Sequence, residues 1–284
     1  MWERAPSTPR DSLPGQGARL AERRRSRRRR GLIAFIALLL LLFAAALYGL
    51  WQNSVRISNI IIYGEDPSLA KYAEEAMQGS YFGIIPRDST FFFPASRIRA
   101  DILATRPDIA AVSIFRNGFT GISIKPSERV PIARWCGLSP TVGVEEYCYV
   151  LDASGHVFAA ASTTTETVNT FALYAPLVGD TLEPPAVSPV EPLRATVAHA
   201  NRLPTVFDFA RQLDTLGSPV TRVVIREDEV DDYLASETRV TYILGRENDA
   251  FTALVSARDN FNLADGSIEY IDLRFDGKVY LKRK

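Results

Sequence analysis

One stretch of the chain constrains its fold more than any other: Gly31–Trp51 carries no charged side chain over 21 residues. A helix of that length can cross the ~30 Å hydrocarbon layer of a bilayer. Tyr48 and Trp51 stand at its far end, where amphipathic aromatic rings favour the membrane interface. We therefore expect a transmembrane helix over residues 31–52.

The residues before this stretch are strongly basic. Residues 1–30 hold ten Arg against three acidic residues, a net charge of +7, so the remainder of this neutral chain carries −7. Positive charge beside a span marks its cytoplasmic side. This predicts a single-pass protein of the cytoplasmic (inner) membrane, with its N-terminus in the cytoplasm and its C-terminal part outside. The competing interpretation is a cleaved signal peptide, with Ala44–Ala46 as the small-residue cleavage site.

The basic tail at 1–30 has a second interpretation as a nucleic-acid binding segment. We expect instead a disordered tail held by anionic lipid headgroups, because it contains no aromatic residue beyond Trp2. The prediction therefore includes a membrane contact and no nucleic-acid partner.

A first block outside the membrane, residues 55–126, has the pattern of a small α+β domain. Alternating β-branched runs indicate strands, and apolar residues at helical spacing indicate two helices. Asn117-Gly118 is a strong hairpin signal, because both residues tolerate a positive φ. An apolar connection at 80–94, with four Phe, joins the two helices. The expected elements are a strand at Arg56–Tyr63, helices around 69–77 and 95–102, and strands at Ile109–Arg116 and Thr120–Lys125.

A second block, residues 128–284, is expected to be a mixed α/β domain that ends in a β-hairpin. Its Thr-, Pro- and Ala-rich segment at 161–192 predicts an exposed, poorly ordered loop. The acidic run at 227–232 lacks the alternating ligands and central Gly of an EF-hand, so we expect a solvated loop between strands rather than a calcium site. The other expected elements are short strands at Pro131–Trp135, Cys148–Leu151 and His156–Phe158, helices around 206–213 and 251–255, and strands at Val220–Arg226, Arg239–Leu244 and on both sides of Asp276-Gly277.

The ordered set of motifs in these blocks resembles the FtsQ/DivIB cell-division family. The run from Pro107 to Val112 with Arg116 is similar to the family's "P-x-V-x-x-A…R" strand, and the run from Ile122 to Ala133 to its "I-x-V-x-E-R-x-P-V-A" segment. Leu244-Gly245 and Ile271–Phe275 are similar to its "L-G" and "V-D-L-R-Y" ending. The sequence departs from the family in Pro126-Ser127, before Glu128-Arg129, and in the Phe-rich connection.

The resemblance implies a POTRA domain (β-α-α-β-β) at 55–126 and an FtsQ-like β-rich domain at 128–284. It further implies a division-site scaffold at the septum that assembles with FtsB/DivIC-like and FtsL-like bitopic proteins and helps control septal cell-wall synthesis. The alternatives are a membrane-anchored cell-envelope enzyme and a POTRA-type transport or outer-membrane assembly component.

The sequence offers no recognisable catalytic or cofactor motif. It has two His, no zinc-spaced Cys or His pair, no Gly-rich phosphate loop and no Gly-x-Ser-x-Gly elbow. Adjacent residues on a strand point to opposite faces, so we expect Glu128-Arg129 to have a structural role at the domain junction rather than to form a catalytic dyad. We therefore expect no enzyme activity, no cofactor, no metal and no small-molecule substrate.

Cys136 and Cys148 are the only cysteines, and both are placed outside the membrane. Thiols outside the cytoplasm tend to pair, and the segment between these two is polar and turn-like. We predict a disulfide between them; the alternative is two free, buried thiols on neighbouring strands.

The partner site is predicted on the C-terminal hairpin, at Lys278, Val279, Tyr280, Leu281 and Lys282. A three-residue loop, 275–277, pairs Leu273 with Val279 and Ile271 with Leu281, so both apolar rows share one buried face. Gly277 is then left-handed.

The final strand is expected to be a sheet edge, which is a template for an added strand. The resemblance points the same way, because the family's last strand receives a segment of FtsB/DivIC. The alternative is an edge protected by its own lysines; those lysines would equally attract an acidic partner segment.

Overall fold

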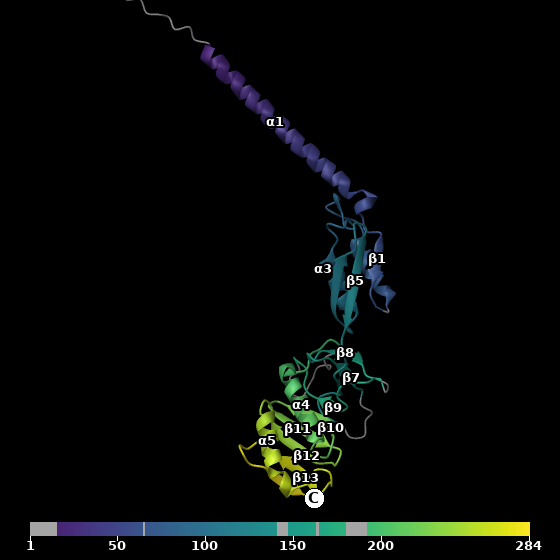
Figure 1. Cartoon of the computed structure of the whole chain (residues 1–284), viewed down its shortest axis with the longest axis vertical. Coiled ribbons are helices and arrows are strands. Elements are labelled where there is room, and N and C mark those ends of the chain that lie inside the picture. Colours follow the sequence, from purple (N-terminus) through teal and green to yellow (C-terminus); the bar gives the residue numbers. More distant parts are fainter. Residues whose placement is uncertain (1–15, 65, 141–146, 163–164, 180–191) are drawn as a thin grey trace, which may run out of the picture. The chain divides into compact units, whose positions relative to one another are not determined.

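The computed structural model describes residues 16–64, 66–140, 147–162, 165–179 and 192–284, with side chains from residue 27 onward. The chain is mixed α+β with one apolar N-terminal helix (Figure 1). It forms two compact units, the first from residues 1–98 and 114–124 and the second from residues 99–113 and 125–284.

Helix α1 runs from Gln16 to Leu50. Its Arg27–Leu50 part is long and apolar enough to cross a membrane, with a mean hydropathy of 2.7 and none of it buried. Length and composition fit a membrane anchor and a signal sequence equally. The Arg-rich segment from residue 16 onward continues the same helix, so the expectation of a disordered tail is wrong for residues 16–30; residues 1–15 lie outside the described residues.

The first unit is built on a three-stranded sheet in the order β1-β5-β4, with β1 parallel to β5. Asp66 begins the first helical turn by accepting a hydrogen bond from the backbone amide of Ser68 (2.9 Å). Met77 and Ile98 belong to its buried apolar set, with Leu69, Ala73, Ala76, Ile122 and Ile124. The elements over residues 53–128 are η1 (Asn53–Val55), β1 (Asn59–Ile62), η2 (Pro67–Leu69), α2 (Ala70–Met77), β2 (Ser80–Tyr81), β3 (Ile85–Pro86), α3 (Ala95–Thr105), β4 (Ile109–Arg116) and β5 (Gly121–Glu128), of which the last three also include residues of the second unit.

The expected turn between β4 and β5 is present. Gly118 has φ +76°, and the amide of Asn117 donates to the carbonyl of Gly121 at 2.8 Å. A Cβ on Gly121 would lie 2.6 Å from the Asn117 carbonyl oxygen, so a side chain there would force the turn open.

The second unit contains a nine-stranded sheet in the order β14-β13-β12-β11-β10-β9-β6-β7-β8. Helices α4 and α5 contribute Phe209 and Leu254 to its apolar core, which includes Val223, Tyr242 and Ile271 of the sheet. The elements are β6 (Ala133–Trp135), β7 (Tyr149–Leu151), β8 (Val157–Ala160), β9 (Ala172–Tyr174), η3 (Ala200–Arg202), α4 (Leu203–Asp214), β10 (Val220–Arg226), β11 (Glu229–Leu234), β12 (Arg239–Ile243), α5 (Glu247–Ala257), η4 (Arg258–Asn260), β13 (Ile268–Asp272) and β14 (Tyr280–Arg283).

Two segments expected to be loops contain strands. The acidic run is not a solvated loop: β11 lies inside the sheet, and Asp231 and Asp232 are 1% and 0% exposed. In the second segment, Ala172–Tyr174 forms β9, with Leu173 fully buried; residues 163–164 and 180–191 lie outside the described residues. In both cases pairing with neighbouring strands overrides a composition typical of loops.

Arg129 joins two segments of the family-like motif within the second unit. Its backbone amide donates to the carbonyl of Asp108 (2.8 Å), its Nε donates to the carbonyl of Pro107 (2.9 Å), and its guanidinium forms an ion pair with Asp152. Burial raises the pKa of Asp152, but hydrogen bonds from Ser154 and Arg129 lower it by more. The side chain of Arg129 therefore has a structural role.

Cys136 and Cys148 form a disulfide, with an S–S distance of 2.02 Å. They follow β6 and precede β7, whose ends pair Trp135 with Tyr149 in antiparallel register. The loop that they close includes residues 141–146, which lie outside the described residues.

Candidate partner-binding edge

Strand β14 stands at one end of the nine-stranded sheet. It pairs with β13 in antiparallel register, and within the described part of the chain no strand lies on its other side. An open edge of this kind presents backbone N–H and C=O groups to any added strand.

The hairpin has the expected register. Ile271 lies opposite Leu281, and Gly277 is left-handed with φ +63°. The strand ladder ends at the pair Asp272 and Tyr280, so Leu273 and Val279 lie just beyond it. A β-turn closes the loop, in which the amide of Lys278 donates to the carbonyl of Phe275 at 3.2 Å.

Burial at the edge differs from the expectation for one residue. Val279 is partly buried and packs on the core, but Leu281 is 37% exposed, so the prediction that it is buried is wrong. An edge residue has a cross-strand neighbour on one side only, here Ile271, and therefore keeps part of its side chain in water. Lys278, Tyr280 and Lys282 are exposed, as expected.

The alternating direction of the backbone N–H and C=O groups shows which of them β14 leaves open at the sheet edge. The amide of Leu273 donates to Thr241 of β12 at 2.8 Å, so residues of the same parity in β13 face β12, and Tyr270 and Asp272 face β14. Their partners Lys282 and Tyr280 turn their backbone groups inward. The N–H and C=O of Leu281 consequently point to the open edge.

The lysines near this edge are partly engaged by local acids. The Lys282 ammonium lies 2.6 Å from Glu269, which raises the pKa of Lys282 through a hydrogen bond, and Lys284 lies 3.1 Å from Glu237. Both pairs are exposed to water, where such interactions are weak. A partner carboxylate could therefore replace either acid.

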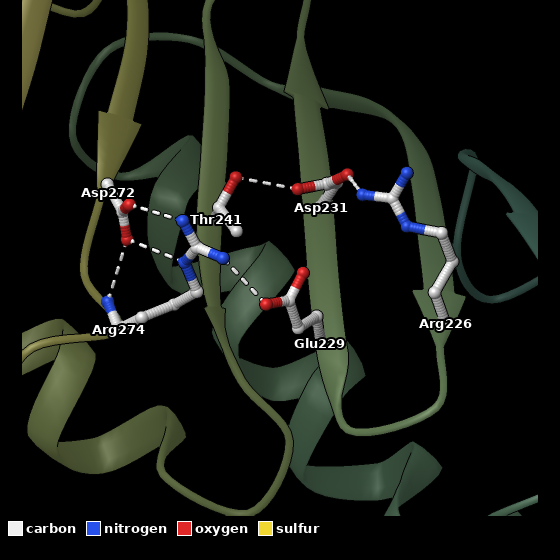
Figure 2. A network of polar contacts seen from close by, with 6 residues as sticks. All are labelled: Arg226, Glu229, Asp231, Thr241, Asp272 and Arg274. Carbon is white, nitrogen blue, oxygen red and sulfur yellow. Dashed lines mark hydrogen bonds and ion pairs between the residues drawn. The ribbon is translucent and has the colours of Figure 1, made fainter.

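Arg274 fixes the segment that leads into the hairpin (Figure 2). Its Nε and Nη2 donate to the Asp272 carboxylate at 3.0 and 2.7 Å, and its Nη1 donates to Glu229 of β11 at 2.6 Å. These hydrogen bonds raise the pKa of Arg274 and lower that of Asp272. Because Asp272 lies opposite Tyr280, this clamp holds the start of β14 in place.

A second set of contacts on the same sheet face pairs the buried carboxylate of Asp231. Asp231 accepts a hydrogen bond from the Thr241 hydroxyl at 2.6 Å and forms an ion pair with Arg226 (Figure 2). The sequence analysis missed both sets, although the Asp-x-Arg spacing at 272–274 is a usable signal: residues two apart on a strand share a face.

A row of alternating cations and tyrosines crosses this face and ends at β14. Arg222, Tyr233, Arg239, Tyr270 and Lys282 are successive cross-strand partners on β10 to β14. The Arg222 guanidinium lies 5.0 Å from the ring centre of Tyr233, and that of Arg239 lies 5.6 Å from Tyr270. This row, which ends at the open edge, is therefore basic and aromatic, and it lies beside the acids Glu229, Asp231 and Asp272 of the same face.

No group of three or more His, Cys, Asp and Glu could hold a metal in the described ranges. A groove of about 530 Å³ in the second unit is lined by acids of the β10–β11 turn with Leu138 and Pro176, and one of about 680 Å³ in the first unit lies between β1 and α2.

A scan against protein-family models and a search of curated proteins both find no match to this chain.

Proposed function

We propose that this chain is a single-pass inner-membrane protein and a cell-division scaffold of the FtsQ/DivIB kind. In this proposal residues 55–126 are a POTRA domain, and the β-rich domain at 128–284 binds FtsB/DivIC-like and FtsL-like proteins outside the membrane, at the septum. The observation that carries the proposal is the open edge of β14, which ends a nine-stranded sheet in the register expected from the apolar alternation of the hairpin.

The elements of residues 55–126 support the POTRA assignment by their order. Strand, two helices and two strands follow one another in β1, α2, α3, β4 and β5, and the last strand lies between the other two in the sheet. Small β2 and β3 strands are inserted between the helices. The contacts of Arg129 with Pro107 and Asp108 give a physical reason for the two motif segments to occur together.

Strand addition is the binding mode that the edge supports best. An extended partner segment would bond to the outward backbone groups of Leu281, while Tyr280 supplies an aromatic anchor of the kind enriched at interfaces. Acidic side chains of the partner would meet Lys278, Lys282 and the row of cations beside them. Main-chain bonds thus provide affinity, and charge provides selectivity.

The test uses the full chain co-expressed with the FtsB/DivIC-like protein of the same organism. Leu281→Pro removes the one amide that points outward at the centre of the edge, so binding is expected to fall at least tenfold. Leu281→Val keeps that amide and is the matched control. Tyr280→Ala and deletion of 278–284 should also weaken binding, with folding checked by circular dichroism. Unchanged affinity in all three, with the domain folded, would exclude the edge as the site.

Topology is tested separately with an impermeant thiol reagent on intact cells. A Cys placed at Ser162 should react, and one placed at Ser26 should not. The reverse pattern would overturn the proposed orientation and with it the scaffold outside the membrane.

A further inference from the structure

The Phe-rich connection between α2 and α3 exposes apolar side chains that the proposed partner site does not use. Phe82 is 98% exposed, Ile84 52%, Phe91 47% and Phe92 49%. Phe119, at the tip of the β4–β5 turn, is 69% exposed. Single exposed apolar residues are ordinary, but a group of large ones on one surface marks an interaction site.

Contacts hold this connection against the end of α1. The indole N–H of Trp51, the residue after that helix, donates to the carbonyl of Ile84 at 2.8 Å. The amide of Ile57 donates to Asp88 at 2.7 Å, and the amide of Thr90 donates to Val55 at 3.0 Å. The Phe-rich connection therefore lies alongside the residues that leave the helix.

The β4–β5 turn is joined to the same place. The Thr90 hydroxyl donates to the carbonyl of Phe119, and the Arg116 guanidinium lies 5.9 Å from the ring centre of Phe91 and within 3.4 Å of its carbonyl oxygen. Two separate loops that carry exposed rings are thus linked by hydrogen bonds to each other and to residues 51–57 after α1, and Arg116 lies against one of the rings. We call Trp51, Phe82, Ile84, Phe91, Phe92 and Phe119 the aromatic patch.

The backbone conformation at Phe82 indicates that the turn itself does not require a Phe at this position. The amide of Ile84 donates to Tyr81 at 3.0 Å, which closes a turn whose central residues, Phe82 and Gly83, have φ +52° and +73°. Turns with two positive φ values favour Asn-Gly, and a bulky residue at positive φ is an outlier. Asn at this position would adopt the positive φ more easily and would be better solvated than a fully exposed Phe. A backbone outlier of this kind points to a function for the side chain.

We propose that the aromatic patch lies in the interface of the extracytoplasmic leaflet of the bilayer that α1 crosses. This inference rests on the proposed membrane anchor. The Arg27–Leu50 segment, 24 residues, is about 36 Å long at 1.5 Å per residue, so its end at Leu50 stands at the interface. Trp51 and the connection bonded to it are then at headgroup depth, where aromatic rings concentrate and where Arg116 meets lipid phosphates.

A bilayer fits the aromatic patch better than a protein partner does, because the patch is held next to the end of α1. The bond between Trp51 and Ile84 fixes the connection next to the helix end, so the lipid surface is already beside it and needs no separate encounter. The consequence is a second attachment point that limits how far the first unit can tilt from the membrane.

The test follows the depth of a fluorescent label on the full chain in vesicles of phosphatidylcholine with a minor fraction of phosphatidylglycerol. Because the two native cysteines are bonded to each other, an introduced Cys is the one free thiol. Environment-sensitive dye is attached to Phe119→Cys in the patch, Leu41→Cys inside α1 or Lys71→Cys at the start of α2. Nitroxide-labelled lipid should strongly quench the fluorescence of the labels at positions 119 and 41. The label at position 71 should keep nearly the fluorescence that it has in vesicles without nitroxide.

Phe82→Asn sharpens the test, since Asn suits the turn and should not lower the melting temperature. In the Phe119→Cys background it should at least halve the quenching, whereas Tyr63→Asn, at another exposed aromatic residue of the unit, should leave it unchanged. A quenched label at position 41 with an unquenched label at 119 would overturn the aromatic patch alone. An unquenched label at 41 would overturn the anchor as well.

Discussion

Arg274 grips the carboxylate of Asp272 with two side-chain hydrogen bonds, 3.0 and 2.7 Å long, and thereby fixes the last residue of β13 opposite the first residue of β14. We predict that Arg274→Ala lowers the free energy of unfolding by about 1 kcal/mol, which is below the usual contribution of a charged hydrogen bond because the pair is partly exposed to water. Urea unfolding of the purified protein measures this. Arg274→Lys keeps the charge but loses the two-pronged guanidinium. It should recover less than half of the free energy of unfolding that Arg274→Ala loses. Full recovery by Lys would show that charge alone matters.

Acid should weaken the same clamp. The hydrogen bond from Arg274 holds the pKa of Asp272 below its usual range. A carboxyl with a lowered folded-state pKa contributes stability that is present above its unfolded pKa, about 3.9, and is lost as the pH falls through the folded value. Unfolding measured between neutral and acidic pH should therefore show a steeper loss in the wild type than in Asp272→Asn. Parallel curves would mean that Asp272 does not titrate differently in the two states.

Asp232 is expected to destabilise the fold. It is fully buried on the core side of β11, between Val223 and Val240, and neither carboxylate oxygen has a hydrogen-bond partner among the described residues. Asp232→Val should raise the free energy of unfolding by about 1–3 kcal/mol, the cost of an unsatisfied buried polar group. Tyr242→Phe, which removes a buried hydroxyl that also has no partner among the described residues, is a milder comparison. A destabilised Asp232→Val protein would show that the carboxyl has a partner in solution.

The pH dependence of this residue has the opposite sign to that of Asp272. Burial raises the pKa of Asp232 well above its ordinary value, and the charges of Asp231 and Glu247 add to the shift. The unfolded chain then releases this proton at a lower pH than the folded chain. Stability should fall as the pH rises from about 4 to the folded-state pKa and stay level above it. The difference between wild type and Asp232→Asn should consequently grow over that range.

Loss of the disulfide should destabilise the second unit. Replacing Cys136 and Cys148 with Ser is expected to cost about 3 kcal/mol, the value for closing a loop of this length. Mass spectrometry of the unreduced protein should find both cysteines bonded. Two free thiols in protein isolated from its native membrane would exclude the bridge.

The parts of the fold that the sequence predicts are those where local pattern and tertiary context agree. The alternation of Ile271 and Leu273 with Val279 and Leu281 gives the hairpin register, because a slip of one residue would turn the apolar row to the opposite face. Asn117-Gly118 likewise marks its turn locally, and the distant Thr90 and Asn59 bond to residues 119 and 120 of the same turn.

The missed parts depend on distant residues. The acids of β11 look solvated because nothing in their own segment shows that Thr241 and Arg226 will pair with Asp231. Strand β9 is hidden in a Thr- and Pro-rich stretch because its partners lie far away in the sequence, β6 about 40 residues before it and β10 about 50 residues after it. The exposure of Leu281 also could not be deduced, since it depends on how far the core extends under the sheet edge.

Backbone amides along β14 point alternately inward and outward, so their hydrogen exchange can report how a ligand binds to the strand. The amides of Tyr280 and Lys282 bond inward to β13, whereas those of Leu281 and Arg283 point outward. In deuterated water the outward amides should exchange quickly and the inward ones slowly, in strict alternation. A ligand that extends the sheet would slow the outward set and erase that alternation, but one that covers only side chains would leave it. Isotope exchange at these backbone positions therefore distinguishes strand addition from surface docking without a mutation.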